Sequence, residues 1–351
     1  MVKYGKCRSR PSRAAEAGVW PRKGIANDIF QAAPQFSHLQ RRMRMVPTLD
    51  FTQRGRTRWL DTLDHACREW GCFQLSNHGL DDALCRSALA DMERFFALPH
   101  EDKLSIERTA ENPWGFYDRE LTKNVRDWKQ IFDVGPRTAL GPFAGASPRW
   151  PQDLAGFRET VEAYYAASES LALTLLADIG ECLGVARGTL EKEFGEGHSS
   201  FLRLNYYPPC QYPDQHLGIS HHTDAGALTV LLPDARPGLQ FMRGEEWHTV
   251  QADPGALIIN IGDIVQVWSN DRYPAPLHRV LANASEARYS APFFLNPGYD
   301  TVYAPLPSAL RGEAPRYRAI NWGEFRAGRA AGDYADVGAE IQISDYYYPE
   351  L

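Results

Sequence analysis

The hydrophobic pattern of the chain changes period near residue 200, and this change separates two kinds of predicted structure. In residues 46–51 (VPTLDF) apolar and polar positions alternate, which predicts a short strand. In the segment that follows, Trp59, Leu63 and Ala66 lie three or four residues apart, as on one face of a helix. Gly71 is expected to end that helix.

Two more helices are predicted before the change of period. After a short strand at 72–78, residues 81–98 have an amphipathic helical pattern that begins at an aspartate cap. Residues 154–184 carry a longer helical pattern, and its terminal glycine suits a helix C-terminus. Residues 101–150 between them show no regular period and are predicted to be irregular.

Beyond residue 200 the period becomes two, which is typical of strands. The short runs rich in β-branched and aromatic residues are FLRLNYY, ALTVLL, LQFM, WHTV, ALIINI, IVQVWS, HRVLA and RYSAPFFL. Gly262-Asp263 separates ALIINI from IVQVWS and is predicted to form a two-residue hairpin turn. Short strands with turn residues between them predict a sandwich or jelly roll with the helices packed outside it, and residues 319–332 predict one more helix.

Composition is that of a globular protein. The chain has 351 residues, of which 44% are hydrophobic, enough for one large domain or two closely packed ones. No apolar run is long enough to span a membrane, and no secretory signal is recognised, so export is not expected. The six cysteines are scattered without a CxxC pair, which predicts reduced thiols in a cytoplasmic protein.

Charge is distributed unevenly. Residues 1–46 carry a net charge of +8 and the remainder −14. An acidic body argues against nucleic-acid binding, which needs clustered basic residues on the folded domain. For the basic segment at residues 1–45 we predict a disordered extension; translation starting at Met43 or Met45, a nucleic-acid or membrane arm, and an organellar presequence are the alternatives.

One set of side chains suggests metal chemistry. His222 directly precedes a predicted strand and Asp224 lies two residues further on, so an extended backbone puts both side chains on one face. His278 begins another predicted strand. Two imidazoles and one carboxylate are the ligands expected for a non-haem Fe(II) with open coordination positions. His221 and His216 compete for the ligand role, although His221 would point to the opposite face from Asp224.

A second set of side chains suggests an anion site. Arg288 and Ser290 lie two residues apart on a predicted strand, and a guanidinium can bind a carboxylate through two hydrogen bonds. The alternative is an arginine in an ordinary salt bridge. Asn205 and Tyr207 form another pair on one face, with an amide and a phenol that could hold further oxygens; alternatively this strand simply ends at its prolines.

Taken together, these motifs resemble those of the Fe(II)- and 2-oxoglutarate-dependent dioxygenases of the isopenicillin N synthase-like superfamily. The resemblance rests on HTDxGxLTVL, GLQF, NIGD, HRV, RYS and PFF, with VPTLDF, GCFQLSNHG, FFALP, DWKQIFDVG and LRLNYYPPC before them, and it runs from about Val46 to about Asp345. It implies a mainly β fold with α-helices, whose core is a double-stranded β-helix, a form of jelly roll, with helices at both ends. The implied regions are 46–199 for the N-terminal part, 200–300 for the catalytic core and 301–351 for the C-terminal helix and tail.

The resemblance also implies an activity and a set of site residues. His222, Asp224 and His278 would bind the iron and be the catalytic centre. Arg288 and Ser290, helped by Tyr207 and Asn205, would hold the distal carboxylate of 2-oxoglutarate. Fe(II), 2-oxoglutarate and O₂, with ascorbate as an activator, would hydroxylate, desaturate or cyclise a small organic molecule and release succinate and CO₂.

The substrate is less clearly encoded. The family contacts substrates at positions that correspond to Phe116, Tyr117, Trp128 and Phe294, each of which could instead pack in the core. An aromatic pocket suits a small, partly apolar molecule. We expect no nucleic-acid or membrane partner and favour a monomer. Two rivals remain: a superfamily oxidase that uses Fe(II) and O₂ without 2-oxoglutarate, and a catalytically silent β-helix module that binds a small carboxylate.

Overall fold

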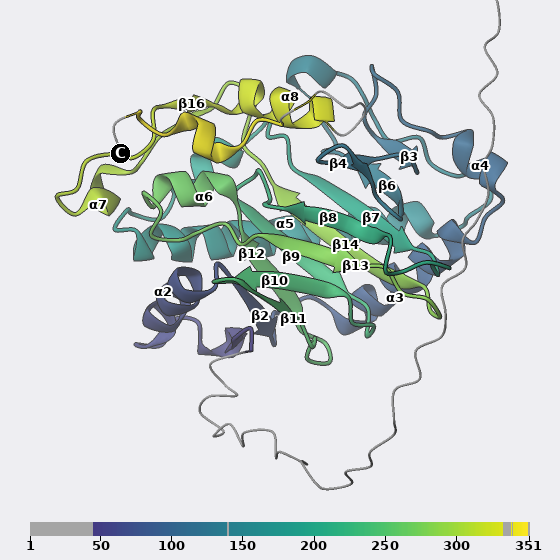
Figure 1. Ribbon diagram of the computed structural model, residues 1–351, viewed down its shortest axis with the longest axis horizontal. Helices are drawn as coiled ribbons and strands as arrows, with labels where there is room; N and C mark the ends of the chain where they lie inside the picture. The colour runs from purple at the N-terminus through teal and green to yellow at the C-terminus, as the bar shows by residue number, and fades with distance from the viewer. Residues whose placement is uncertain (1–44, 139, 333–337, 339, 350–351) are drawn as a thin grey trace, which may run out of the picture. The chain divides into compact units, whose positions relative to one another are not determined.

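Two β-sheets face each other in the computed structural model, which describes residues 45–138, 140–332, 338 and 340–349 (Figure 1). The larger sheet has the strand order β1-β2-β12-β9-β14-β7-β6-β3, and the smaller has the order β11-β10-β13-β8. The large-sheet strands are β1 (Thr48–Asp50), β2 (Cys72–Ser76), β3 (Gly115–Tyr117), β6 (Gln130–Val134), β7 (Phe201–Tyr207), β9 (Leu228–Pro233), β12 (Leu257–Ile261) and β14 (Arg288–Leu295). The small-sheet strands are β8 (Leu217–His222), β10 (Leu239–Arg243), β11 (Glu246–Thr249) and β13 (His278–Leu281).

The central strands of the large sheet are buried on both faces. All five residues of β12 are buried, as are the first five of β9, and both strands are mainly Leu, Ile and Val. β9 pairs with β12 and with β14, in both cases antiparallel. Burial of such strands between two layers provides most of the stabilising apolar contact in a sandwich.

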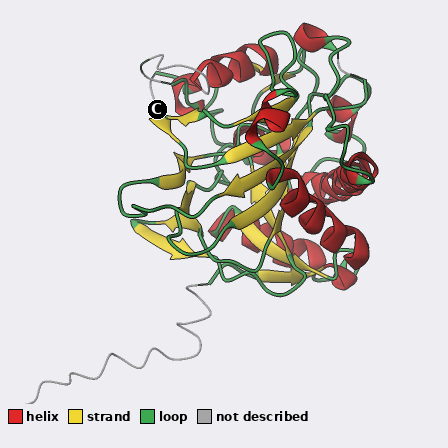
Figure 2. Cartoon of the chain, turned by 90° about the vertical axis from the view of Figure 1, so that its right-hand side faces the viewer, coloured by secondary structure: helices red, strands yellow, loops and turns green. Residues whose placement is uncertain are grey.

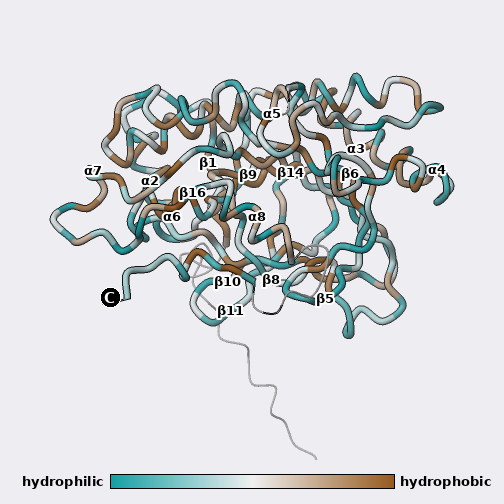
Figure 3. Tube along the Cα trace, turned by 90° about the horizontal axis from the view of Figure 1, so that it is seen from above, coloured by the Kyte–Doolittle hydropathy of each residue, from teal (hydrophilic) through white to brown (hydrophobic). Residues whose placement is uncertain are grey.

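Three helices cover one face of the large sheet: α2 (Trp59–Glu69), α3 (Asp82–Phe96) and α5 (Phe157–Cys182). α5 contacts α2, α3, β9 and β14. Seen from above, α5 lies on one side of β9 and β14, and β8 and β10 lie on the other (Figure 3), so the order of layers is helix, large sheet, small sheet. Figure 2 shows the same separation, with the long helices to one side of the strands.

Local capping explains where these helices begin and end. The side chain of Asp81 accepts a hydrogen bond from the Ala83 amide at 2.8 Å and caps α3, as expected from the sequence. α5 ends before Gly184, whose φ of +81° is the left-handed conformation that glycine adopts most easily. The helix expected around Trp59, Leu63 and Ala66 and those expected at 81–98, 154–184 and 319–332 are all present.

The remaining elements are short. They are η1 (Phe51–Gln53), α4 (His100–Leu104), β4 (Leu121–Thr122), β5 (Val125–Arg126), η2 (Gly141–Phe143), η3 (Glu191–Phe194), α6 (Asp263–Trp268), β15 (Val302–Tyr303), α7 (Pro307–Leu310), β16 (Ile320–Asn321), α8 (Trp322–Gly332) and η4 (Ile343–Tyr346). α8 continues directly from β16.

The jelly-roll prediction is confirmed, but two local predictions are wrong. The run IVQVWS is not a strand after a hairpin turn at Gly262-Asp263; it is the helix α6. A short apolar run does not distinguish a buried strand from a buried helix by periodicity alone, and here tertiary contacts decided. Residues 101–150 are not irregular either, because they contain α4 and four short strands, of which β6 pairs with β7.

The basic segment 1–44 lies outside the described residues, so the prediction of a disordered extension remains untested. Among the residues that the structure does describe, no helix is long and apolar enough to cross a membrane. The boundaries proposed at residues 46, 200 and 301 also remain predictions.

Candidate active site

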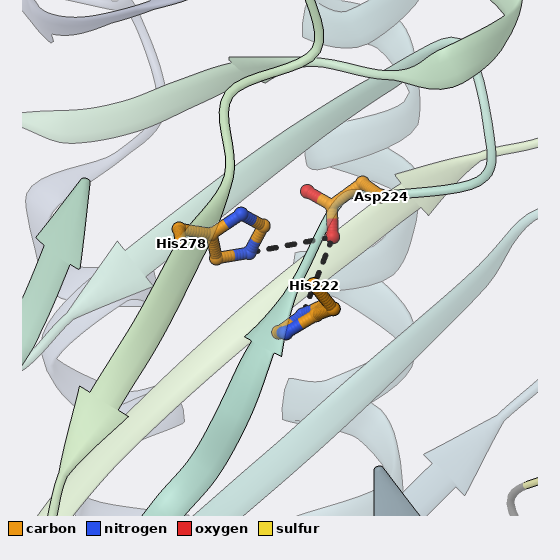
Figure 4. Close-up of side chains that lie close together, drawn as sticks. All are labelled: His222, Asp224 and His278. Carbon is orange, nitrogen blue, oxygen red and sulfur yellow. Dashed lines mark ion pairs between the residues drawn. The ribbon is translucent and has the colours of Figure 1, made fainter. Parts of the chain in front are cut away.

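Three side chains converge where the small sheet ends. His278 at the start of β13 pairs in register with His222 at the end of β8, and their ring centroids lie 4.2 Å apart. Asp224 follows β8 by two residues. Its Oδ1 lies 3.9 Å from Nε2 of His222 and 3.6 Å from Nε2 of His278 (Figure 4). The three ligand atoms lie within 4.8 Å of one another, so one metal ion could contact all of them.

Backbone carbonyls orient both imidazoles. Nδ1 of His222 bonds to the Ser220 carbonyl at 2.8 Å, and Nδ1 of His278 bonds to the Pro276 carbonyl at 3.0 Å. A carbonyl can only accept, so each Nδ1 carries the hydrogen and each Nε2 keeps its lone pair. Burial, aided by the neighbouring His278, lowers the pKa of His222 well below its usual value and keeps that ring neutral near pH 7. A neutral imidazole is the form that binds a metal.

Two polar side chains hold the Asp224 carboxylate. Its Oδ2 accepts hydrogen bonds from Thr229 Oγ1 at 2.6 Å and from Asn260 Nδ2 at 3.1 Å, which leaves Oδ1 facing the histidines. Thr229 and Asn260 oppose each other on β9 and β12. The sequence analysis did not identify this pair. A threonine and an asparagine inside two otherwise apolar buried strands were the available signal.

The helix α6, mistaken for a strand in the sequence, fastens the loop that carries Asp224. The amide of Asp263 donates to the Asp224 carbonyl at 2.8 Å, and the amide of Ile264 donates to the Gly226 carbonyl at 3.1 Å. Gly262 permits this approach, because a Cβ there would lie 2.1 Å from the Gly226 carbonyl oxygen. The helix start therefore helps to position a candidate metal ligand.

A buried arginine lies in the wall of the same cavity. β14 and β7 bring Arg288 opposite Tyr207 and Ser290 opposite Asn205, so the four predicted residues form two cross-strand pairs. All four line a cavity of about 150 Å³ together with the three candidate ligands. Arg288 is 3% exposed, and among the described residues its Nε and Nη1 have no hydrogen-bond partner. Asn205 Nδ2 donates to Ser290 Oγ at 3.5 Å.

A buried guanidinium with nitrogens that lack hydrogen-bond partners is costly unless an anion binds to it. Beside it stand two imidazoles and one carboxylate whose ligand atoms converge. This donor set fits a divalent iron, and the guanidinium fits a dicarboxylate bound next to it.

A cluster of six charged side chains, five buried and one half-buried, borders this cavity, and the sequence analysis missed it. Its cations are Arg108, Lys129 and Arg203, and its carboxylates are Glu120, Asp127 and Asp133. We call these six residues the ion cluster. Burial raises the pKa of Glu120, but Arg203, Lys129 and Arg108 outweigh it and hold the pKa well below its usual value. Glu120 is therefore ionised at neutral pH.

The ion cluster reaches the candidate metal ligands through one residue. Asp127 Oδ1 accepts a hydrogen bond from the Ser220 amide at 3.2 Å, and the Ser220 carbonyl is the group that orients His222. Lys129 Nζ lies 3.0 Å from Asp127 Oδ2 and 2.8 Å from Glu120 Oε2. The cluster thus fixes the end of β8, although none of its members belongs to the predicted site.

The four aromatic residues expected to contact substrate are placed differently from one another. Phe294 lines the cavity and stacks on Phe201 at 4.7 Å. Tyr117 lines a neighbouring cavity. Phe116 is fully buried in the core, and Trp128 bonds to the Pro208 carbonyl at 3.1 Å, so the structure does not bring these two to the cavity.

The competing histidines lie apart from the three candidate ligands. His221 is exposed to solvent. His216 packs against Trp128, with ring centroids 5.0 Å apart. The described residues therefore bring His222, rather than either competitor, to Asp224 and His278.

Comparisons with known proteins agree with this geometry. Residues 198–297 match the profile of the 2OG-Fe(II) oxygenase superfamily, and residues 46–153 match "non-haem dioxygenase in morphine synthesis N-terminal". Jasmonate-induced oxygenase 4 of Arabidopsis thaliana is 33% identical over 291 residues, which cover 80% of this chain and 81% of that protein. Gibberellin 20 oxidase 2 of Oryza sativa subsp. indica is 36% identical over 265 residues, which cover 74% and 67%.

A solved structure extends the similarity to three dimensions. A crystal structure of JOX2 in complex with 2OG, Fe and JA superposes with a TM-score of 0.77 at 28% identity and covers 87% of this chain and 89% of that one. The family requires Fe(II), 2-oxoglutarate and O₂, and the convergent side chains above suit the first two. The chain belongs to the Fe(II)- and 2-oxoglutarate-dependent oxygenase superfamily and is a non-haem iron dioxygenase that acts on a small organic molecule.

Proposed function

We propose that His222, Asp224 and His278 bind the iron of this dioxygenase, and that Arg288 binds the distal carboxylate of 2-oxoglutarate. Ser290, Tyr207 and Asn205 assist Arg288. The observation that carries this proposal is a single cavity that holds both the three convergent ligand atoms and a buried guanidinium with unpartnered nitrogens. A carboxylate there would accept charge-assisted hydrogen bonds from donors that otherwise remain unsatisfied.

Bound iron and 2-oxoglutarate supply the oxidising chemistry: 2-oxoglutarate, O₂ and a substrate C–H bond give succinate, CO₂ and a hydroxylated product. The protein's own contribution is positional. Thr229 and Asn260 direct one Asp224 oxygen towards the metal, and backbone carbonyls direct the two imidazoles. We propose hydroxylation as the reaction. Desaturation and ring closure are the alternatives, in which the oxidation involves a further atom of the substrate.

The metal assignment is tested by substitution. His222→Ala and His278→Ala should each abolish Fe(II) binding in an anaerobic titration and abolish succinate release, because each removes one of three protein ligands. The matched control is His221→Ala, since His221 is an exposed neighbour on the same strand. Iron affinity like that of the wild type in either site variant would refute the assignment, and so would equal damage from His221→Ala.

We also propose that the enzyme is a cytoplasmic monomer. The free thiols of Cys67, Cys72, Cys85, Cys182 and Cys210 support a reducing compartment. Light scattering after size-exclusion chromatography should give the mass of one chain, and fractionation of cells should place the activity in the cytosol. The mass of a dimer would contradict the monomer, and activity in an organelle fraction would contradict the cytoplasmic location.

A further inference from the structure

A second, larger cavity adjoins the cavity of the candidate metal ligands, which we call the metal cavity. The second has a volume of about 660 Å³, and we call it the outer cavity. The two share Phe201, Arg203 and Arg326 as a common wall. Sites for small organic molecules usually measure roughly 300–1,000 Å³. The metal cavity of about 150 Å³ lies below that range, whereas the outer cavity lies within it.

A row of aromatic rings runs from the outer cavity to the metal cavity. The centroid distances are 6.3 Å for Tyr299–Phe143, 6.4 Å for Phe143–Trp114, 6.1 Å for Trp114–Phe201 and 4.7 Å for Phe201–Phe294. The first four rings line the outer cavity, and Phe294 lines the metal cavity. Such a row offers flat apolar surfaces to a ring-containing molecule.

The charged side chains of the outer cavity are largely paired within the protein. Arg108 and Arg203 both pair with Asp133, and Arg119 pairs with Glu107. All five of these residues line the outer cavity. A charge that already has a partner of opposite sign attracts a further charge only weakly. We therefore expect the rings and the hydrogen-bonding groups of the outer cavity to select the substrate.

Small residues on α8 line the same cavity as these rings. Ala327, Ala330 and Ala331 are spaced three and four residues apart, which puts them on one helix face, and all three line the outer cavity. Larger side chains at these positions would occupy part of its volume.

The outer cavity also contains a buried donor. Trp114 is 6% exposed, and within the described part of the chain its indole Nε1 has no hydrogen-bond partner. The backbone holds this indole closely, because a Cβ at Gly135 would lie 2.2 Å from Cε2 of Trp114. An acceptor oxygen on a bound molecule would satisfy the indole N–H.

From these observations we propose that the primary substrate is a flat, ring-containing molecule with a hydrogen-bond acceptor. Its rings lie in the outer cavity between the aromatic row and α8, and its acceptor bonds to Nε1 of Trp114. The proposal rests on the proposed function, because iron and 2-oxoglutarate must occupy the metal cavity for the outer cavity to take the substrate. Trp114 and Ala330 are then specificity-determining residues, the first for the acceptor and the second for size.

Anaerobic equilibrium dialysis with Fe(II) and 2-oxoglutarate tests this inference, because turnover cannot occur without O₂. Two uncharged probes share one carbon skeleton: 2-naphthamide is flat, and its saturated analogue decahydronaphthalene-2-carboxamide is thicker. The wild type should bind the flat amide more tightly than the saturated one by about two- to tenfold, the range expected for contacts between aromatic rings.

Two substitutions separate the acceptor from the size of the molecule. Trp114→Phe keeps a ring but removes the donor. Both probes carry the same carbonyl acceptor, so both should weaken by the same factor of about two to ten, and the preference for the flat probe should remain. Ala330→Trp should weaken both probes by on the order of tenfold or more, since the indole fills part of the cavity, and Ala330→Leu should do so to a smaller extent.

Two control variants complete the design. Glu324→Trp adds the same bulk as Ala330→Trp at an exposed position of α8. Trp247→Phe removes an indole N–H from β11 and lines neither cavity. Both controls should bind the two probes as the wild type does.

Four results would overturn the inference. They are a wild type that binds neither probe, a wild type that does not prefer the flat one, wild-type binding of both probes by Trp114→Phe, and Ala330→Trp and Ala330→Leu variants that both behave like Glu324→Trp. Retention of Fe(II) and 2-oxoglutarate in the same dialysis cells shows that each variant is folded. It also reports separately on the proposed function, whose failure would show as loss of these two from the wild type.

Discussion

Two buried cations, Lys129 and Arg288, line the cavity of the candidate metal site, and their charges are neutralised in different ways. Lys129 is 5% exposed and lies within 3.0 Å of two carboxylates of the ion cluster, Glu120 and Asp127. Arg288 is 3% exposed, and no described carboxylate pairs with it. Because an unpaired buried charge is unfavourable, carboxylates of the protein neutralise the charge of Lys129, whereas the charge of Arg288 is neutralised only by a ligand.

This difference assigns the ion cluster to positioning the site and Arg288 to binding a ligand. The ion cluster ends at Ser220, whose backbone orients His222, so its charges stabilise the scaffold of the site. Arg288 contributes little to the fold by this reasoning, and its unpartnered nitrogens are available to a carboxylate. Substitutions in the two groups should therefore affect different measurements.

The largest effect is expected from the ion cluster. Glu120→Gln removes a carboxylate that pairs with Arg108, Lys129 and Arg203, and breaking a buried ion pair typically costs about 3–5 kcal/mol. Chemical denaturation of the metal-free protein should show a loss of this size in the free energy of unfolding. Arg288→Met is the contrasting variant and should leave that free energy unchanged or raise it. Equal losses of unfolding free energy in the two variants would contradict the distinction between the ion cluster and Arg288.

The next effect concerns co-substrate affinity. Arg288→Lys keeps the charge but loses the planar fork, so the apparent KM for 2-oxoglutarate should rise by about ten- to a hundredfold, equivalent to roughly 1.5–3 kcal/mol. Ser290→Ala should raise it more mildly. If the defect instead appeared in the KM of the primary substrate, Arg288 would bind the substrate rather than 2-oxoglutarate.

A smaller effect is expected at the metal end of the cavity. Thr229→Val removes one of the two hydrogen bonds that orient Asp224, and such losses weaken metal affinity by about tenfold. An anaerobic Fe(II) titration measures it. Thr174→Val is the control, because its hydroxyl bonds to the Ser170 carbonyl within α5, far along the chain from the site. Unchanged iron affinity in Thr229→Val would show that Asn260 alone suffices.

The smallest effect is a dependence on pH. The pKa of Glu120 is lowered in the folded protein from a usual value of 4.5, so its stabilising contribution is fully present above that value. Below that value the Glu120 carboxyl takes up a proton in the unfolded chain but not in the folded protein, so stability falls as pH falls. The stability advantage of the wild type over Glu120→Gln should shrink by about 1 kcal/mol between pH 4.5 and 3.5. The difference in unfolding free energy between the wild type and Arg288→Met should not show this change between pH 4.5 and 3.5. A change of the same size there would contradict the comparison.

Much of the candidate site could be predicted because strand alternation is a local property. Residues two apart share a face, which linked His222 to Asp224, Arg288 to Ser290 and Asn205 to Tyr207 before any fold was known. The long amphipathic helices and their caps were predictable for the same reason, since spacing and capping depend on neighbouring residues.

Tertiary structure decided which of these faces meet. Register between β8 and β13 brings His278 to His222, and register between β7 and β14 joins the two pairs around Arg288. The Thr229–Asn260 pair was missed because its two members are isolated polar residues on strands that lie apart in the chain. The ion cluster was missed because most of its members lie in a segment with no regular period, and Arg203 joins them only through the pairing of β6 with β7.

The same reason explains the wrong strand assignment of IVQVWS, and it applies to two aromatic residues whose role in substrate binding stays a prediction. IVQVWS became the helix α6 because backbone hydrogen bonds to the loop of Asp224 hold its start, and no local pattern records such contacts. Phe116 and Trp128 lie outside the cavity because an aromatic residue is equally suited to a core and to a pocket. Alternation along the chain therefore determined which residues share a face, and only long-range packing determined which of these faces meet around the candidate metal site.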